Sequence, residues 1–138
     1  MVAQFSIELN SRRRGFHLIT GEILDAIRNC KIKQGIVHVF VQHTSASLSI
    51  NENADPSVRV DMESFINRLV PENSPYFTHT YEGPDDMPAH IKSSIFGSSV
   101  SFPLNEGRAM LGTWQGIYLC EHREQGGRRK LIVTVTGE

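Results

Sequence analysis

The 138-residue chain contains only two cysteines, Cys30 and Cys120, and they stand far apart. Two isolated cysteines cannot build the disulfide framework of a small secreted protein, and they cannot supply the paired ligands of a zinc ribbon. Cys30 ends a helix-like stretch and Cys120 lies in an apolar segment. We therefore expect both to be buried free thiols.

The sequence also lacks a strong charge of either sign, because its formal net charge is only −1. A dedicated nucleic-acid-binding protein is normally visibly basic, so this class is disfavoured. No hydrophobic run approaches the length of a membrane-spanning helix, and the N-terminus lacks the basic and apolar regions of a secretory signal. We expect a cytoplasmic protein that binds neither nucleic acid nor membranes.

The motifs of several common enzyme classes are missing, since the chain has no GxGxxG, P-loop, GxSxG or CxxC sequence. Dinucleotide and P-loop nucleotide binding are therefore disfavoured, and no organic cofactor is expected. Ser45 and Ser47 stand close to His43. Without a strand–GxSxG–helix elbow, however, serine catalysis is not favoured.

Short apolar alternations and turn residues predict an α+β fold. Strands are expected over 5–9, 15–19, 35–42, 100–104, 109–122 and 130–136, and the strand over 109–122 is expected to be broken at Gly112 and Gly116. Helices are expected over 22–29, 56–70 and 88–95, capped by Thr20, Asp55 and either Asp85 or Asp86. Since short turns join strands that pair antiparallel, the Gln125-Gly126-Gly127 turn should pair the last two strands. We expect a single domain over 1–138, with an antiparallel, sandwich-like core and two or three helices.

The segment from His43 to Pro56, HTSASLSINENADP, is the densest polar feature of the chain. It follows a predicted strand and ends in Asp55-Pro56, a strong helix start. We expect a loop that contains a short strand at Leu48 and Ile50. Strands commonly position binding groups on such loops, although Ser, Asn and Asp can also simply cap and turn the chain. As a cluster, these residues are interpreted as a site.

Histidines are numerous, six in all, and three of them stand in polar surroundings. His43 ends a predicted strand, and His79 lies in a long loop rich in Pro, Asn and Gly. His90 follows Asp86 by four residues, so both can face one cation from a single helix face. These four residues are candidate ligands of a divalent cation, Mg²⁺ or Zn²⁺. The alternative is a set of unrelated surface histidines.

The stretch LGTWQGIY carries two glycines inside a predicted strand, Gly112 and Gly116. Glycine in a strand usually marks a bulge or a close approach by another backbone or a ligand. Trp114 between them fits a stacking surface, a subunit contact or a core position. Beyond it, Glu121 and Arg123 would form either a surface ion pair or a carboxylate and a phosphate-binding fork at a site rim.

Three motifs, HTSASLSINENADP, PAHIKSSIFGSS and LGTWQGIYLCE, resemble the YjbQ-like family. Its members are small proteins often labelled secondary thiamine-phosphate synthases, and the resemblance runs from about Phe5 to Gly137. It implies an α+β fold around a β-sandwich and a homotrimer with sites near subunit boundaries. It also implies an ability, as a main or secondary activity, to join the pyrimidine and thiazole halves of thiamine phosphate.

The implied reaction assigns roles to these residues. A hydroxymethylpyrimidine pyrophosphate loses pyrophosphate and the thiazole nitrogen attacks, so charge stabilisation matters more than covalent chemistry. His43 and His90 would ligate the cation or contact phosphate, and Arg123 would neutralise pyrophosphate. The candidate sets are: catalytic His43, Asn51, Glu52, Asp55, Gln115 and Glu121; substrate-binding Ser45, Ser47, Trp114 and Arg123; metal-binding His43, His79, Asp86 and His90.

Two other functions stay open. The missing catalytic signature and the serine-rich segment 93–101 also suit a binding protein for a small phosphorylated metabolite without turnover. The histidines also suit a metal-dependent hydrolase that uses a zinc-bound water.

Overall fold

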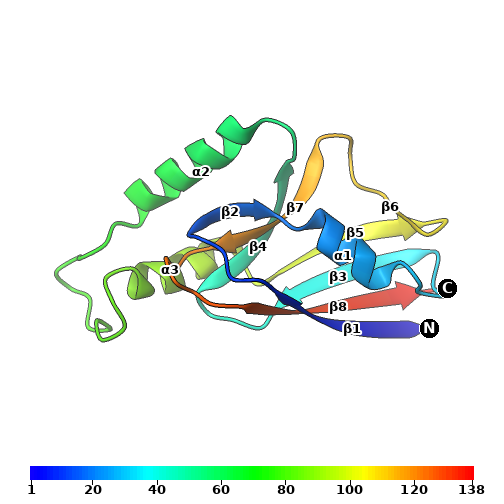
Figure 1. Ribbon diagram of the computed structural model, residues 1–138, viewed down its shortest axis with the longest axis horizontal. Helices are drawn as coiled ribbons and strands as arrows, with labels where there is room; N and C mark the ends of the chain where they lie inside the picture. Colours follow the sequence, from blue (N-terminus) through cyan, green and yellow to red (C-terminus); the bar gives the residue numbers. More distant parts are fainter.

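The computed structural model describes all residues from 1 to 138, and its strands form two antiparallel sheets (Figure 1). The first sheet contains, in spatial order, β1 (Val2–Leu9), β8 (Arg129–Gly137), β3 (Gly35–Val41), β5 (Ser99–Asn105) and β6 (Arg108–Ala109). The second contains β2 (Gly15–Leu18), β7 (Gln115–Glu121) and β4 (Ala46–Glu52). The helices are α1 (Thr20–Ile27), α2 (Pro56–Leu69) and α3 (Asp86–Phe96). The predicted α+β class is confirmed, with three helices.

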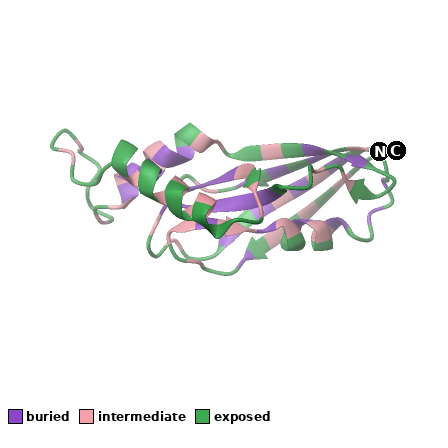
Figure 2. Cartoon of the chain, turned by 90° about the horizontal axis from the view of Figure 1, so that it is seen from above, coloured by how far each residue is buried: buried purple, intermediate pink, exposed green.

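The main core lies between the buried faces of the two sheets and α1. On β3 the inward valines Val37, Val39 and Val41 are at most 1% exposed, while outward Phe40 is 41% exposed. Apolar side chains of β4, β7, β8 and α1 join these valines in one cluster of 18 buried residues. Figure 2 shows this burial as purple stripes along the strands. Burial of each Val, Leu, Ile or Phe side chain in this cluster stabilises the fold by about 1.5–3 kcal/mol.

A smaller core lies on the other side of the second sheet, beneath α2. It contains Phe16, Ile66, Val70, Tyr118 and Cys120. Alternate residues of β7 therefore face two different cores, which explains why this strand is a continuous apolar run. Cys30 and Cys120 are both buried free thiols, as predicted.

Two predicted segments differ in the structure. Most of the expected polar loop is a strand, β4, because Ala46 and Leu48 alternate into the main core. The strand predicted over 109–122 has its predicted break at Gly112, since β6 ends at Ala109 and β7 begins only at Gln115, but it has none at Gly116, which lies within β7.

The predicted pairing of the last two strands is wrong. β7 already has β2 on one edge and β4 on the other, so it has no free edge for β8. The turn at Gln125, Gly126 and Gly127 instead carries the chain into the other sheet, where β8 pairs with β1 and β3.

The three helices begin at Thr20, Pro56 and Asp86, close to the predicted starts, but two of the expected caps are wrong. Asp55 caps α2 as predicted, and its carboxylate accepts a hydrogen bond of 2.9 Å from Ser57 N. Thr20 instead is the first residue of α1, and its Oγ1 accepts a bond from Ile117 N in β7. Asp85 precedes α3 without capping it, because its carboxylate binds Arg123. In both cases the side chain bonds a group from a distant part of the chain and not a free N–H of its own helix.

None of the three helices is both long and apolar enough to cross a membrane. The two ends of the chain lie side by side (Figure 2), and the amino group of Met1 donates to the carbonyl of Gly137.

Candidate functional site

Three side chains converge at the start of α3. In this His–Asp–His cluster, formed by His79, Asp86 and His90, the possible ligand atoms all lie within 4.8 Å of one another. Asp86 Oδ2 is 2.6 Å from His79 Nε2 and 3.1 Å from His90 Nε2. Asp86 is buried, while both imidazoles are partly exposed. The cluster therefore combines a fixed carboxylate with two rings that a solute can reach.

Helix spacing and the preceding loop together build this cluster. Asp86 and His90 stand four residues apart in α3, so their side chains lie on one face, as predicted. His79 belongs to the loop between α2 and α3 and meets His90 with ring centroids 5.2 Å apart. Sequence spacing alone could not show this last approach.

The hydrogen bonds of His90 determine which of its nitrogens carries hydrogen. Nδ1 lies 3.0 Å from the carbonyl oxygen of Thr44, which can only accept, so Nδ1 carries the hydrogen. In neutral His90, Nε2 then directs a lone pair at Asp86 Oδ2, which is also an acceptor. A proton or a cation between these two atoms would satisfy both. A backbone carbonyl on the second nitrogen is also the usual partner of a metal-binding histidine.

Arg123 holds the acidic part of the cluster in place. Its Nη1 donates to Asp86 Oδ1 at 2.7 Å and its Nε donates to Asp85 Oδ2 at 3.0 Å. Burial works to raise the pKa of Asp86, but the hydrogen bonds and the nearby Arg123 charge outweigh it and lower that pKa. Asp86 is thus a carboxylate at neutral pH. In this chain Arg123 is occupied by protein acceptors.

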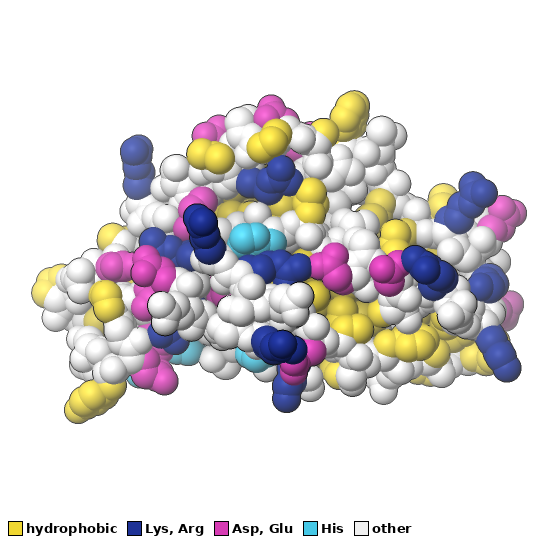
Figure 3. All heavy atoms as spheres, in the orientation of Figure 1, with side chains coloured by type: hydrophobic (Ala, Val, Ile, Leu, Met, Phe, Trp, Pro, Cys, Tyr) yellow, Lys and Arg dark blue, Asp and Glu magenta, His cyan; other side chains and the backbone are white.

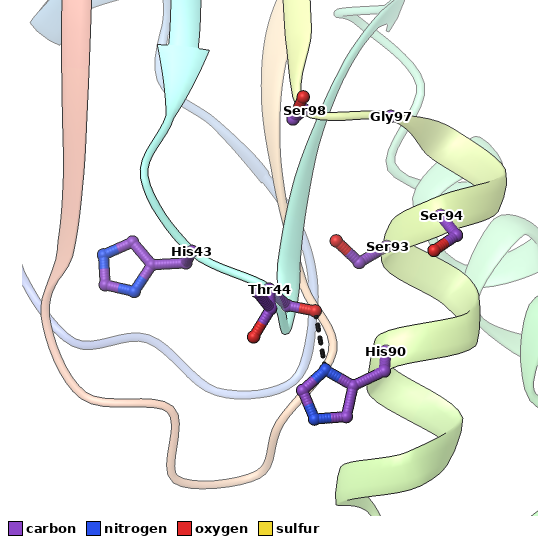
Figure 4. A pocket seen from close by; sticks show the side chains of 7 residues that line it. All are labelled: His43, Thr44, His90, Ser93, Ser94, Gly97 and Ser98. Atoms are coloured by element: carbon purple, nitrogen blue, oxygen red, sulfur yellow. Dashed lines mark hydrogen bonds between the residues drawn. The ribbon is translucent and has the colours of Figure 1, made fainter.

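A polar pocket of about 430 Å³ adjoins the cluster and shares His90 with it (Figure 4). No hydrophobic side chain lines it; its walls are His43, Thr44, His90, Ser93, Ser94, Gly97 and Ser98. A second hollow, of about 270 Å³, has His79 in its wall together with Phe77 and Met87. The cluster thus lies between a hydroxyl-rich pocket and a partly apolar one.

His43 is one of the residues that line the polar pocket, but its ring points away from His90 and α3 (Figure 4) and makes no contact with the cluster. Its Nε2 accepts a 2.8 Å hydrogen bond from the backbone N–H of Lys130, so that nitrogen is already occupied. Burial, followed by the charge of Arg129, lowers the pKa of His43. His43 is therefore a neutral ring beside the pocket.

Glu121 and Ser45 meet Arg129 behind His43. Arg129 Nε donates to Glu121 Oε1 at 2.7 Å, and Nη2 donates to Ser45 Oγ at 3.1 Å. Glu121 is 0% exposed and Arg129 is 3% exposed. The sequence indicated only a basic cluster at 128–130. Arg129 is two residues before the buried Leu131 on β8, so strand alternation could have predicted that its side chain points inward.

Five other predicted site residues lie at the opposite end of the second sheet: Asn51, Glu52, Asp55, Trp114 and Gln115. The six residue steps of β4 separate them from the polar pocket by roughly 20 Å. The polar side chains among them hold local turns; Glu52 Oε2 accepts from Ala54 N, and Gln115 Oε1 accepts from Gly112 N, while Trp114 is exposed. Within one chain they do not meet the His–Asp–His cluster.

Ser47 is buried and has no access to the pocket. Its Oγ lies 2.7 Å from Nε2 of His122, a histidine that the sequence did not single out. Burial, followed by the charges of Lys92 and Arg129, lowers the pKa of His122 to about 3. This pair is therefore an internal, uncharged contact.

Comparisons with known proteins agree with this architecture. The sequence model described as "UPF0047 protein YjbQ-like" matches residues 5–138. A UPF0047 protein YjbQ from Escherichia coli O157:H7 is 52% identical over 136 residues, covering 98% of each chain. A UPF0047 protein from Methanocaldococcus jannaschii is 42% identical, covering 100% of this chain and 96% of its own.

Solved structures show the same fold. The structure of a protein of unknown function from Sulfolobus solfataricus P2 has a TM-score of 0.88 at 27% identity, covering 100% of this chain and 99% of its own. An uncharacterised protein from Clostridium acetobutylicum has a TM-score of 0.85 at 34% identity, covering 95% and 98%. The chain belongs to the YjbQ-like UPF0047 family.

Proposed function

We propose that the His–Asp–His cluster holds a divalent cation, and that the protein is a cation-dependent transferase acting on a small phosphorylated metabolite in the polar pocket. One observation carries the cation: His90 Nε2 and Asp86 Oδ2 are two acceptors that face each other at 3.1 Å. Thr44 fixes the tautomer of His90, and Arg123 keeps Asp86 ionised.

The ligand set favours zinc or another transition metal. Mg²⁺ prefers oxygen ligands, whereas two imidazole nitrogens and one carboxylate suit Zn²⁺. Three protein ligands with an open fourth position are the pattern of catalytic zinc sites. Such a cation would stabilise the charge of a departing phosphate or pyrophosphate.

Thiamine-phosphate synthesis is the first reaction to test, because the family resemblance suggests it and the site suits it. The carbon–oxygen bond to pyrophosphate breaks with its electron pair, and the thiazole nitrogen lone pair forms the new carbon–nitrogen bond. No protein nucleophile is needed, which agrees with the burial of Ser47 and Cys120. The protein's task would be orientation and charge stabilisation.

The cation itself is tested with protein purified without a histidine tag. We expect about one zinc per chain by elemental analysis, and His90→Gln should weaken zinc binding by more than about tenfold, since even outer-shell changes often cost that much. His38→Gln is the matched control because His38 is an exposed histidine on the outer face of β3. Absence of bound metal, or equal affinity in both variants, would refute the cation site.

Turnover is tested separately with the zinc-loaded protein and both thiamine precursors. We expect thiamine phosphate to form, to disappear with a chelator and to be lost in Asp86→Asn. If metal-loaded protein yields no product, the transferase proposal fails while the cation site stands.

The open fourth position also favours a second candidate, a hydrolase that uses a zinc-bound water. Release of inorganic phosphate from a phosphorylated substrate, without the second precursor, would identify this activity.

A further inference from the structure

We propose that Arg129 and His43 form an oxyanion-binding site at the edge of the polar pocket, for the phosphate or carboxylate group of a metabolite. The inference deepens the proposed function, since it names what holds the ligand's anionic group. It uses no residue of the His–Asp–His cluster, so it can be tested without a metal.

Arg129 has one terminal nitrogen whose hydrogens lack a protein acceptor. Nε and Nη2 both donate to the carboxylate of Glu121, at 2.7 and 2.5 Å, and Nη2 also donates to Ser45. Nη1 approaches a single polar atom, Nδ1 of His43, at 3.4 Å. A guanidinium can only donate, so the role of this contact depends on the His43 tautomer.

The backbone of Lys130 decides that tautomer. Its N–H donates to His43 Nε2 at 2.8 Å, so Nε2 holds the lone pair and Nδ1 of the neutral ring carries the hydrogen. Arg129 Nη1 and His43 Nδ1 are therefore two donors that face each other, with no acceptor between them.

A single oxygen of an oxyanion accepts from both donors. Two nitrogens 3.4 Å apart can each lie within hydrogen-bond distance of one oxygen, as paired donors do in an oxyanion hole. Hydrogen bonds to a charged acceptor are the strong ones, and a largely buried arginine places them in a region of low dielectric.

Contacts within the protein fix the direction of Arg129 Nη1 before any ligand binds. Glu121 holds the guanidinium in two-point contact, and the turn at Gly126 packs directly on this pair. A Cβ at Gly126 would lie 2.5 Å from both Arg129 Nη2 and Glu121 Oε1, so the turn leaves no room for movement. Because Glu121 offsets the Arg129 charge, the site should select oxyanion geometry rather than any small anion.

One of the two donor side chains, His43, lies beside the polar pocket, whereas Arg129 is buried behind it. His43 lines the same pocket as His90, and His90 bonds to Thr44, the next residue in the chain (Figure 4). A group held by His43 and Arg129 would therefore lie at the edge of the pocket whose wall also contains His90.

The test uses the full chain treated with a chelator, in a chloride background of constant ionic strength. We expect inorganic phosphate to bind saturably, with the side-chain ¹⁵N signals of His43 Nδ1 and Arg129 Nη shifting together. Sulfate and acetate titrations distinguish a tetrahedral from a carboxylate ligand. The ¹⁵N spectrum of the free protein should show hydrogen on His43 Nδ1.

Two substitutions of His43 test whether the anion needs the Nδ1 donor itself or only the imidazole ring. Glutamine at 43 retains an acceptor for the Lys130 N–H but removes the Nδ1 donor, so His43→Gln should weaken phosphate binding by about tenfold or more. Asparagine places its amide near the former Nδ1, so His43→Asn should retain more of the affinity. Thermal unfolding confirms that both variants are folded.

Three results would overturn the inference: an Nε2–H tautomer for His43, no saturable binding of any oxyanion, or equal affinities in wild type and His43→Gln. Loss of metal binding alone would leave it intact. Phosphate binding without zinc would thus separate this site from the proposed function.

Discussion

The same side chain serves different purposes in this protein because its environment differs. His90 is partly exposed and donates to a backbone carbonyl, so its Nε2 faces the carboxylate of Asp86. His43 has Nε2 occupied by a backbone N–H, which leaves a donor at Nδ1. His122 is 1% exposed and makes its contact with Ser47. Chemical type alone therefore does not identify the functional histidine.

His122 should make the protein sensitive to acid. Its folded pKa is about 3, against about 6.5 in the unfolded chain, so it is neutral when folded and binds a proton on unfolding within this window. Its contribution to stability is present above pH 6.5 and is lost as the pH falls toward 3. Between these two pKa values, the free energy of unfolding should fall by about 1.4 kcal/mol for each pH unit of acidification.

Denaturant unfolding of wild type and His122→Gln at pH 7 and pH 4.5 measures this effect. The variant should lose less stability on acidification than the wild type, while His38→Gln should behave like the wild type. Equal pH dependence in all three proteins would show that His122 does not cause it.

At the element scale, the glycines of β7 show how close packing limits the sequence. A Cβ at Gly116 would lie 2.6 Å from Leu18 Cδ2 and 2.9 Å from Asn53 Cβ. The predicted close approach at this glycine is therefore real, and the approaching groups are neighbouring protein segments.

Gly116→Ala should destabilise the fold by about 1–3 kcal/mol, because the added methyl overpacks the contact with β2. Gly21→Ala is a matched control: Gly21 lies in α1 with nothing within 4 Å of its Cβ position. Helix propensity predicts that this variant gains up to about 1 kcal/mol. Equal unfolding midpoints for the two variants would contradict the packing argument.

At the scale of the whole molecule, charged side chains of both signs are interspersed on the face seen in Figure 3. This agrees with the formal net charge of −1. The unusual surface feature is apolar: Phe65 and Leu69, four residues apart on one face of α2, are both more than half exposed, as is Val60 on another side of the helix. Clustered exposed apolar side chains commonly mark an interaction site.

The homotrimer implied by the family resemblance would give α2 a partner. We expect the protein to have three times the chain mass in light scattering after size exclusion. Phe65→Glu should shift it toward the monomer, whereas Ser64→Glu, the same charge at the neighbouring exposed position, should not. A monomeric wild type would refute the trimer, and a trimeric Phe65→Glu would remove α2 from the contact.

Much of the fold followed from local patterns. The alternation on β3, the Asp55-Pro56 start of α2 and the end of α3 at Gly97 were all predicted correctly. Pairing was harder, because a turn shows that a chain reverses but not whether the next strand stays in the same sheet. Of the two breaks predicted in the 109–122 strand, the one at Gly112 lies between β6 and β7 and the one at Gly116 is absent, since a glycine alone does not reveal whether its neighbours leave the sheet.

The candidate site was predictable only in part. The spacing of Asp86 and His90 places both on one helix face, because helical geometry is local. The approach of His79, the burial of Arg129 beside Glu121 and the hydrogen bond from Lys130 to His43 depend on contacts between distant segments.

By itself the sequence determined the α+β class, most of the elements and the family, because periodicity, caps and motifs are carried by neighbouring residues. Only the tertiary structure decided which polar groups share a site. It separated Asn51, Glu52 and Gln115 from the histidines by the length of a strand. It also gave a backbone partner to Nδ1 of His90 but to Nε2 of His43. Those outcomes depend on hydrogen-bond partners and strand ends that only the packed chain brings into place.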